Sequence, residues 1–137
     1  MGVIIDKPQH LQIGQAGEYL AAAALQSHFR TIAFPGIAAP YDLIAESYSG
    51  SFLKCQVKAS THINIVHGCR YWKFNTCRSK GEYHESEVDF FALVSLPRRL
   101  VYFVGIADVM YNHRIRENEM TQRAEIESLD KVLGKYL

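Results

Sequence analysis

The chain has 137 residues, of which 48% are hydrophobic and 21% are charged, and this composition excludes both a disordered chain and one embedded in a membrane. The length fits a single domain with one core. Lys and Arg number 15 against 14 Asp and Glu, for a formal net charge of +1, so the total charge alone argues against a polyanionic partner.

The first predicted element is a helix over residues 9–29, where apolar residues recur at helical spacing. Gly14 and Gly17 each weaken a helix, so their presence indicates that another segment packs closely on it. Strands and a final weak helix follow at 31–34, 41–48, 51–60, 63–66, 70–76, 88–95, 100–106 and 123–133. This order predicts an α+β fold with an α/β-type mixed sheet, on which the N-terminal helix packs.

The cysteines indicate where the protein works. Cys55, Cys69 and Cys77 are an odd number without a close pair, which favours a reduced cytoplasmic protein over a disulfide framework. The N-terminus is no signal peptide, and no run approaches the ~18 apolar residues of a membrane span. We expect one intracellular domain over 1–137, with a flexible N-terminus at 1–8 and a tail at 107–137.

A short loop sets the geometry of the most informative segment. The loop at 48–50 ends in Gly50 and is typical of a three-residue hairpin connection. In the register that it sets, paired positions sum to 98, so Asp42 faces Gln56. The two-residue period of a strand adds Lys58 to the same face. A carboxylate, an amide oxygen and an ammonium therefore converge.

This convergence has two interpretations. Mg²⁺ prefers oxygen ligands and takes one or two carboxylates from a protein, while a neighbouring lysine can hold the attacking water or offset charge on a phosphate. Alternatively, Asp42 is a turn residue and Gln56 and Lys58 belong to a solvated face. A zinc site from His62, His67, Cys69 and Cys77 lacks the usual ligand spacing.

Three motifs together resemble the PD-(D/E)XK nuclease superfamily, the fold of restriction endonucleases and archaeal Holliday junction resolvases. They are Gly-Gln-Ala-Gly-Glu at 14–18, Pro-Tyr-Asp-Leu-Ile at 40–44 and Gln-Val-Lys at 56–58, and the resemblance covers roughly residues 10–106. The Gln-Val-Lys motif is similar to a small branch that includes a cyanobacterial intron-encoded homing endonuclease. The resemblance implies a restriction-endonuclease-like core and an Mg²⁺-dependent hydrolase of DNA phosphodiesters, with Mn²⁺ as a substitute.

The resemblance also implies a catalytic set of Glu18, Asp42, Gln56 and Lys58. Asp42 is then the principal metal ligand, Glu18 supplies a second acid directly or through water, and Lys58 is the catalytic lysine. Gln56 occupies a position that is usually acidic. An amide removes one negative charge from the metal site, which either leaves an active enzyme with weaker metal affinity or marks a degenerate one.

The net charge of +1 conceals a basic centre. Between Glu46 and Glu82 the chain has no acidic residue, and aromatic residues are interleaved with its cations, as in a surface that binds a phosphate backbone. Arg98, Arg99, Arg114 and Arg116 are interpreted first as solvated. The predicted contacts to double-stranded DNA are Lys54, Arg70, Lys73, Asn75, Arg78 and Lys80.

The small size predicts a homo-oligomer, a dimer or a tetramer, because one copy covers little DNA. The apolar end at 132–137 and the segment 100–112 are candidate oligomer surfaces, and the 107–137 tail could also bind DNA. The predicted activity is site-specific cleavage of duplex DNA. The alternatives are a structure-selective nuclease like a Holliday junction resolvase, a non-catalytic DNA-binding module on a degenerate nuclease fold, and a scaffold protein.

Overall fold

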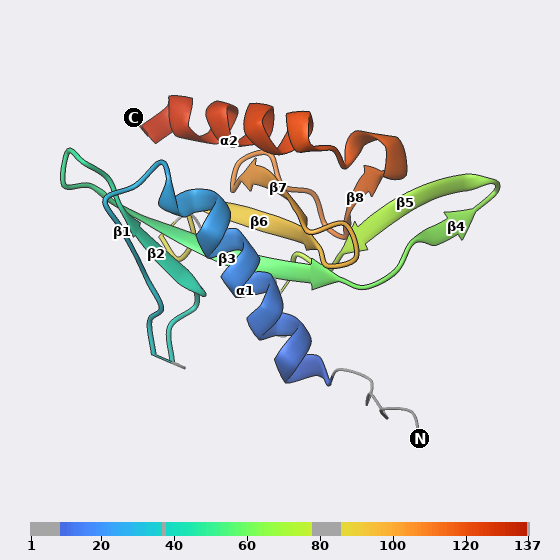
Figure 1. Ribbon diagram of the computed structural model, residues 1–137, viewed down its shortest axis with the longest axis horizontal. Coiled ribbons are helices and arrows are strands. Elements are labelled where there is room, and N and C mark those ends of the chain that lie inside the picture. The colour runs from blue at the N-terminus through green and yellow to red at the C-terminus, as the bar shows by residue number, and fades with distance from the viewer. Residues whose placement is uncertain (1–8, 37, 78–85, 137) are drawn as a thin grey trace, which may run out of the picture.

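The computed structural model describes residues 9–36, 38–77 and 86–136 (Figure 1). Its elements, in chain order, are α1 (His10–Gln26), β1 (Thr31–Ala33), β2 (Leu43–Glu46), β3 (Phe52–Ser60), β4 (Asn64–Val66), β5 (Cys69–Phe74), β6 (Phe90–Ser95), β7 (Leu100–Gly105), β8 (His113–Arg116), the short 3₁₀-helix η1 (Glu117–Glu119) and α2 (Gln122–Tyr136). No helix among these residues is long and apolar enough to span a membrane.

The strands form two sheets. The larger has the order β1-β2-β3-β6-β7, in which β3 and β6 are parallel and the other pairs are antiparallel. The smaller sheet, β4-β5-β8, is antiparallel throughout. The predicted α+β fold with a mixed sheet is confirmed. Its chain order places the β4–β5 hairpin inside the crossover from β3 to β6.

Each face of the larger sheet has its own core. On one face, Cys55 and Val57 of β3 pack with α1 and α2 around Leu25 and Leu129. On the opposite face, Phe91 and Leu93 of β6 pack with the aromatic residues of the small sheet. The second core includes Trp72, Phe74 and Ile115. Successive side chains of β3 lie on opposite faces of the larger sheet. The face that carries Gln56 and Lys58 is directed toward the small sheet.

The β2–β3 hairpin has the predicted register. Leu43 pairs with Cys55 and Glu46 pairs with Phe52, so the paired positions sum to 98. Gly50 has φ of +91°, a conformation that glycine adopts without the steric penalty that a Cβ brings. The pairing ends at Leu43, and the N–H of Asp42 donates to the carbonyl of Cys55 at 2.9 Å, so the predicted pairing of Asp42 with Gln56 is not formed.

The small sheet was predicted only in part. His67 and Gly68 have φ of +50° and +79°, as a two-residue type I′ turn requires, and they join β4 directly to β5. Strand β8 was not predicted, because only Ile115 of its four side chains is buried and so short a segment shows no period. The hairpin of β4 and β5 extends away from the rest of the molecule (Figure 1).

The segment predicted as a tail is part of the fold. Its residues form β8, η1 and α2, and α2 packs along β7. The backbone N–H of Val101 donates to Glu125 Oε1 at 2.8 Å, and that of Phe103 donates to Ser128 Oγ at 3.0 Å. Val132, predicted as part of an oligomer surface, is instead 3% exposed in the core, because the apolar stripe of α2 covers the sheet.

Candidate active site

Asp42 is fixed at the start of β2 by two backbone hydrogen bonds. Its own N–H donates to the carbonyl of Cys55 at 2.9 Å, and its Oδ2 accepts from the N–H of Val57 at 2.9 Å. Both partners belong to β3, so the carboxylate is held against the strand that carries Gln56 and Lys58. Burial raises the pKa of Asp42, while the Val57 bond, the Lys58 charge and a hydrogen bond with Glu18 lower it; the net direction is upward.

Glu18 reaches this carboxylate from α1. A Cβ added at Gly17 would lie 2.9 Å from Ala59 Cβ, so the glycine permits a close approach of α1 to β3. The next residue along the helix, Glu18, then forms a side-chain hydrogen bond with Asp42. Burial, the Asp42 charge and this bond all raise the pKa of Glu18.

Gln56 and Lys58 complete the group from β3. Gln56 is 8% exposed and lies on β3 between Cys55 and Val57, whose backbone groups bind Asp42. Burial lowers the pKa of Lys58, and the charges of Asp42 and Cys77 oppose that shift. Cys77 follows β5, so the end of the small sheet lies close to Lys58. Glu18, Asp42 and Lys58 therefore come together from α1, the β2 start and β3, and Gln56 lies two residues before Lys58 on the same face of β3.

The donor set suits a divalent cation of the Mg²⁺ type. Glu18 and Asp42 are neighbouring acids whose pKa values are both raised, and a cation bound between them would stabilise their charged forms. The Gln56 amide oxygen is a neutral ligand of the same hard type. In the described residues, no three His, Cys, Asp or Glu side chains come together as metal ligands. The alternative of a zinc site from His62, His67, Cys69 and Cys77 therefore has no support in the structure.

The residues predicted to contact DNA occupy different environments. Lys73 and Asn75 are exposed on β5 and just beyond it, and Asn75 Oδ1 accepts from the N–H of Cys77 at 3.1 Å. The Lys54 ammonium donates to the carbonyl of Ser86. Arg78 and Lys80 lie outside the described residues.

Arg70 is bound by an acid that is distant in sequence. Its Nε and Nη2 donate to the two oxygens of Glu117, each at 3.1 Å, and Arg98 lies 3.6 Å from the same carboxylate. This bidentate pair raises the pKa of Arg70 and lowers that of Glu117. The acid-free centre of the sequence is thus partly neutralised in space by η1.

Arg114 and Arg116, predicted first as solvated charges, lie on the small sheet beside Lys73 and Tyr71. Both are exposed on β8, where Arg114 pairs with Lys73 and Arg116 pairs with Tyr71. The Arg114 guanidinium lies 4.9 Å from the centre of the Tyr71 ring. The signal available in the sequence was the alternation Arg-Ile-Arg at 114–116, which places both cations on one face of a strand.

Comparisons with known proteins agree with this geometry. A family model described as PD-(D/E)XK endonuclease matches residues 9–131. Among solved structures, the chain is similar to a bacterial homing endonuclease, I-Ssp6803I, at 20% sequence identity and a TM-score of 0.65, over 93% of this chain and 95% of that chain. At this identity the likeness concerns the fold. No curated protein matches.

Proposed function

Because the chain belongs to the PD-(D/E)XK endonuclease family, we propose that it cleaves duplex DNA at specific sites with a divalent metal ion, Mg²⁺ or Mn²⁺. The observation that supports this proposal most directly is the meeting of the Glu18 and Asp42 carboxylates beside Gln56 and Lys58. The structural similarity to a homing endonuclease favours site-specific cleavage over the other nuclease functions.

The metal would be held by Asp42 and Glu18, with the Gln56 amide oxygen completing the protein's share of the ligands. A divalent ion bound there supplies Lewis-acid activation of water and of the scissile phosphate. Asp42 suits the role of principal ligand because the Val57 N–H orients its carboxylate. A bound cation would favour the charged forms of both acids and so oppose the upward shift in their pKa values.

Lys58 would orient the nucleophile and stabilise the phosphate. Its ammonium is half-buried and is held near the Asp42 carboxylate. In this position it can donate hydrogen bonds to the attacking water and to a phosphate oxygen on which negative charge develops. Gln56 is neutral, so it can orient the bound water or the ligand shell without adding a third negative charge to the site.

The test uses the purified protein, a randomised duplex library and Mg²⁺, followed by sequencing of the cleaved ends. We expect ends at a defined sequence, and losses of about 100-fold or more in cleavage rate for Asp42→Asn and Lys58→Met. Matched controls are Glu46→Gln, a carboxylate at the far end of β2, and Lys131→Met on α2; both should cleave normally.

Other outcomes identify the alternatives. Cleavage confined to a four-way junction would assign a structure-selective nuclease, and salt-dependent DNA binding without cleavage in Mg²⁺ or Mn²⁺ would assign a binding module. Equal cleavage by Asp42→Asn and the parent protein would refute the site. We also propose that the active form is a dimer or a tetramer, which sedimentation at cleavage concentrations measures.

A further inference from the structure

The outer face of the small sheet, which faces away from the second core, is a basic surface. The register places seven side chains on this face: Asn64, Val66, Cys69, Tyr71, Lys73, Arg114 and Arg116. None of them is acidic. Within the described residues, Lys73, Arg114 and Arg116 form no ion pair. The face therefore presents three cations to the solvent.

The arrangement of these cations lowers the stability of the small sheet. Lys73 and Arg114 are direct cross-strand partners, and like charges in that position destabilise a sheet. An acid at either position would form a favourable pair, as Glu117 does with Arg70. A polyanion bound to this face would convert the repulsion between the two cations into attraction for the ligand.

Arg114 is held in a defined position on this face. Its guanidinium stacks over the Tyr71 ring at 4.9 Å, and Tyr71 itself is only 8% exposed. A planar guanidinium that is already oriented loses less freedom when it donates two parallel hydrogen bonds. Such a fork suits the O6 and N7 acceptors of guanine in the major groove.

We propose that the outer face of the β4–β5–β8 sheet enters the major groove of duplex DNA, with Arg114 as the base-reading side chain and Lys73 and Arg116 as phosphate contacts. The inference rests on the proposed DNA substrate. The Lys73–Arg114 and Tyr71–Arg116 rows are two residues apart along β8, about 7 Å, which equals the rise of two base pairs.

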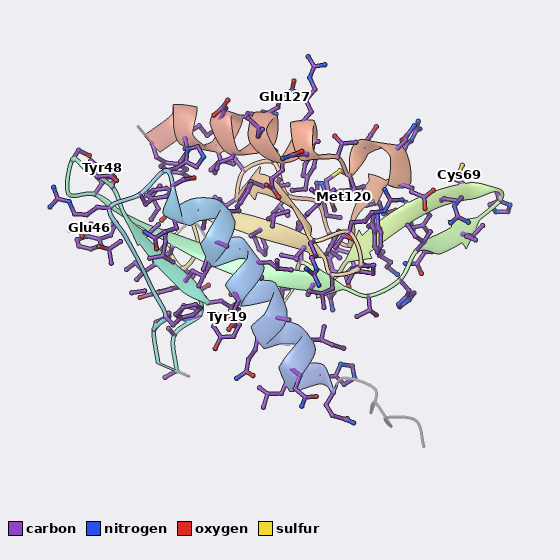
Figure 2. All side chains as sticks on the ribbon, viewed as in Figure 1. Tyr19, Glu46, Tyr48, Cys69, Met120 and Glu127 are labelled. Atoms are coloured by element: carbon purple, nitrogen blue, oxygen red, sulfur yellow. The ribbon has the colours of Figure 1, made fainter. Side chains whose placement is uncertain are left out.

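The shape of this region favours DNA over double-stranded RNA. The β4–β5 hairpin extends from the body of the molecule (Figure 1), and Figure 2 shows Cys69 near its far end, well away from Tyr19 on α1. The major groove of B-form DNA admits a two-stranded ribbon such as β4–β5 or β5–β8, whereas the major groove of A-form RNA is too narrow and deep for side chains to read.

The two ends of this basic face differ in their position relative to the active site. A groove of about 740 Å³ at the hairpin-turn end of this face is lined by Arg114 and Arg116 and by the acids Glu117 and Glu119 of η1. The acids oppose phosphate at that end. The opposite end of β5 leads to Cys77, which lies near Lys58. DNA would therefore run from the Lys73–Arg114 row toward Lys58.

The test selects bound sequences from a randomised duplex library, using protein that carries Asp42→Asn so that binding is measured without cleavage. Arg114→Lys retains the charge but not the fork. We expect it to relax the selected sequence at one or two positions and to weaken binding to the parent's preferred sequence about tenfold or more. The slope of log affinity against log salt should stay constant.

Arg116→Gln should weaken binding to all sequences alike and reduce that slope by about 0.9. The matched control is Arg123→Gln on α2, whose partner Glu127 projects away from the body (Figure 2); it should change neither readout. If Arg114→Lys selects the parent's sequence with unchanged affinity, or if double-stranded RNA competes equally, the inference is wrong.

The experiments can refute the DNA-reading face without refuting the nuclease proposal, and the reverse. Cleavage by the protein with Asp42 intact, together with an unchanged sequence preference in Arg114→Lys, would refute the reading face and leave the nuclease proposal standing. A relaxed preference in Arg114→Lys without cleavage by the intact protein would support the reading face and refute the nuclease proposal.

Discussion

Gly17→Ala tests how the fold brings the two acids together. The new Cβ would lie 2.9 Å from Ala59 Cβ, well inside the ~3.5–4.0 Å at which carbon atoms normally rest. Both atoms are attached rigidly to backbone, so α1 must move away from β3 by up to about 1 Å. Glu18 moves with it, and a misplacement of this size costs about 100-fold in rate when the group acts in catalysis.

The expected effect on stability is small by comparison. Replacing glycine by alanine favours the helix by about 1 kcal/mol, whereas an overpacked contact costs about 1–3 kcal/mol. The free energy of unfolding should therefore fall by roughly 0–2 kcal/mol. Urea unfolding followed by circular dichroism measures this change, and initial rates of DNA cleavage at fixed Mg²⁺ measure the catalytic effect.

The matched control and the rescue variant make the experiment decisive. A Cβ at Gly14 meets nothing within 4 Å, so Gly14→Ala should stabilise the protein by up to about 1 kcal/mol and cleave normally. Ala59→Gly removes the other atom of the clash and should restore most of the cleavage rate to Gly17→Ala. If folded Gly17→Ala cleaves like the parent, the close approach of α1 does not position Glu18.

Two further predictions concern stability. Ser128→Ala leaves the buried N–H of Phe103 without its 3.0 Å acceptor, so the free energy of unfolding should fall by about 1–3 kcal/mol; a loss below 0.5 kcal/mol in urea unfolding would contradict this role. His113 Nδ1 accepts from the N–H of Met110 at 3.1 Å, and burial lowers the pKa of His113. The unfolded chain therefore binds this proton more readily, so stability should be lost as pH falls from its ordinary pKa of about 6.5 toward its lower folded value. His113→Asn, which keeps an acceptor but does not titrate, should reduce that pH dependence between pH 7 and pH 5; equal slopes in the two proteins would exclude the effect.

Local signals predicted the part of the site that lies on one hairpin. The loop ending in Gly50 fixes the register of β2 and β3 as far as Leu43, and the same hairpin brings the Asp42 carboxylate against β3. The two-residue period then adds Lys58. The position of Glu18 followed from the family resemblance, with Gly17 as the physical sign of a close approach between α1 and the sheet.

Contacts that join distant segments could not be predicted in this way. Arg70 and Glu117 are 47 residues apart, and no period or turn links them, so the neutralisation of Arg70 appears only in the fold. Strand β8 is short and mostly exposed. Without it, Arg114 and Arg116 could not be placed beside Lys73, and they were interpreted as separate solvated charges.

Helix α2 covers the outer edge of β7, and this limits how copies of this chain can associate. Glu125 and Ser128 bind the N–H groups of Val101 and Phe103 that point away from the sheet, so those donors are not open to a strand from another molecule. The other edge strand of the larger sheet is the three-residue β1. A strand from a second copy could extend the sheet only there. A symmetric continuous sheet through two subunits would therefore have to pair β1 with β1, and association by any other route must rely on side chains.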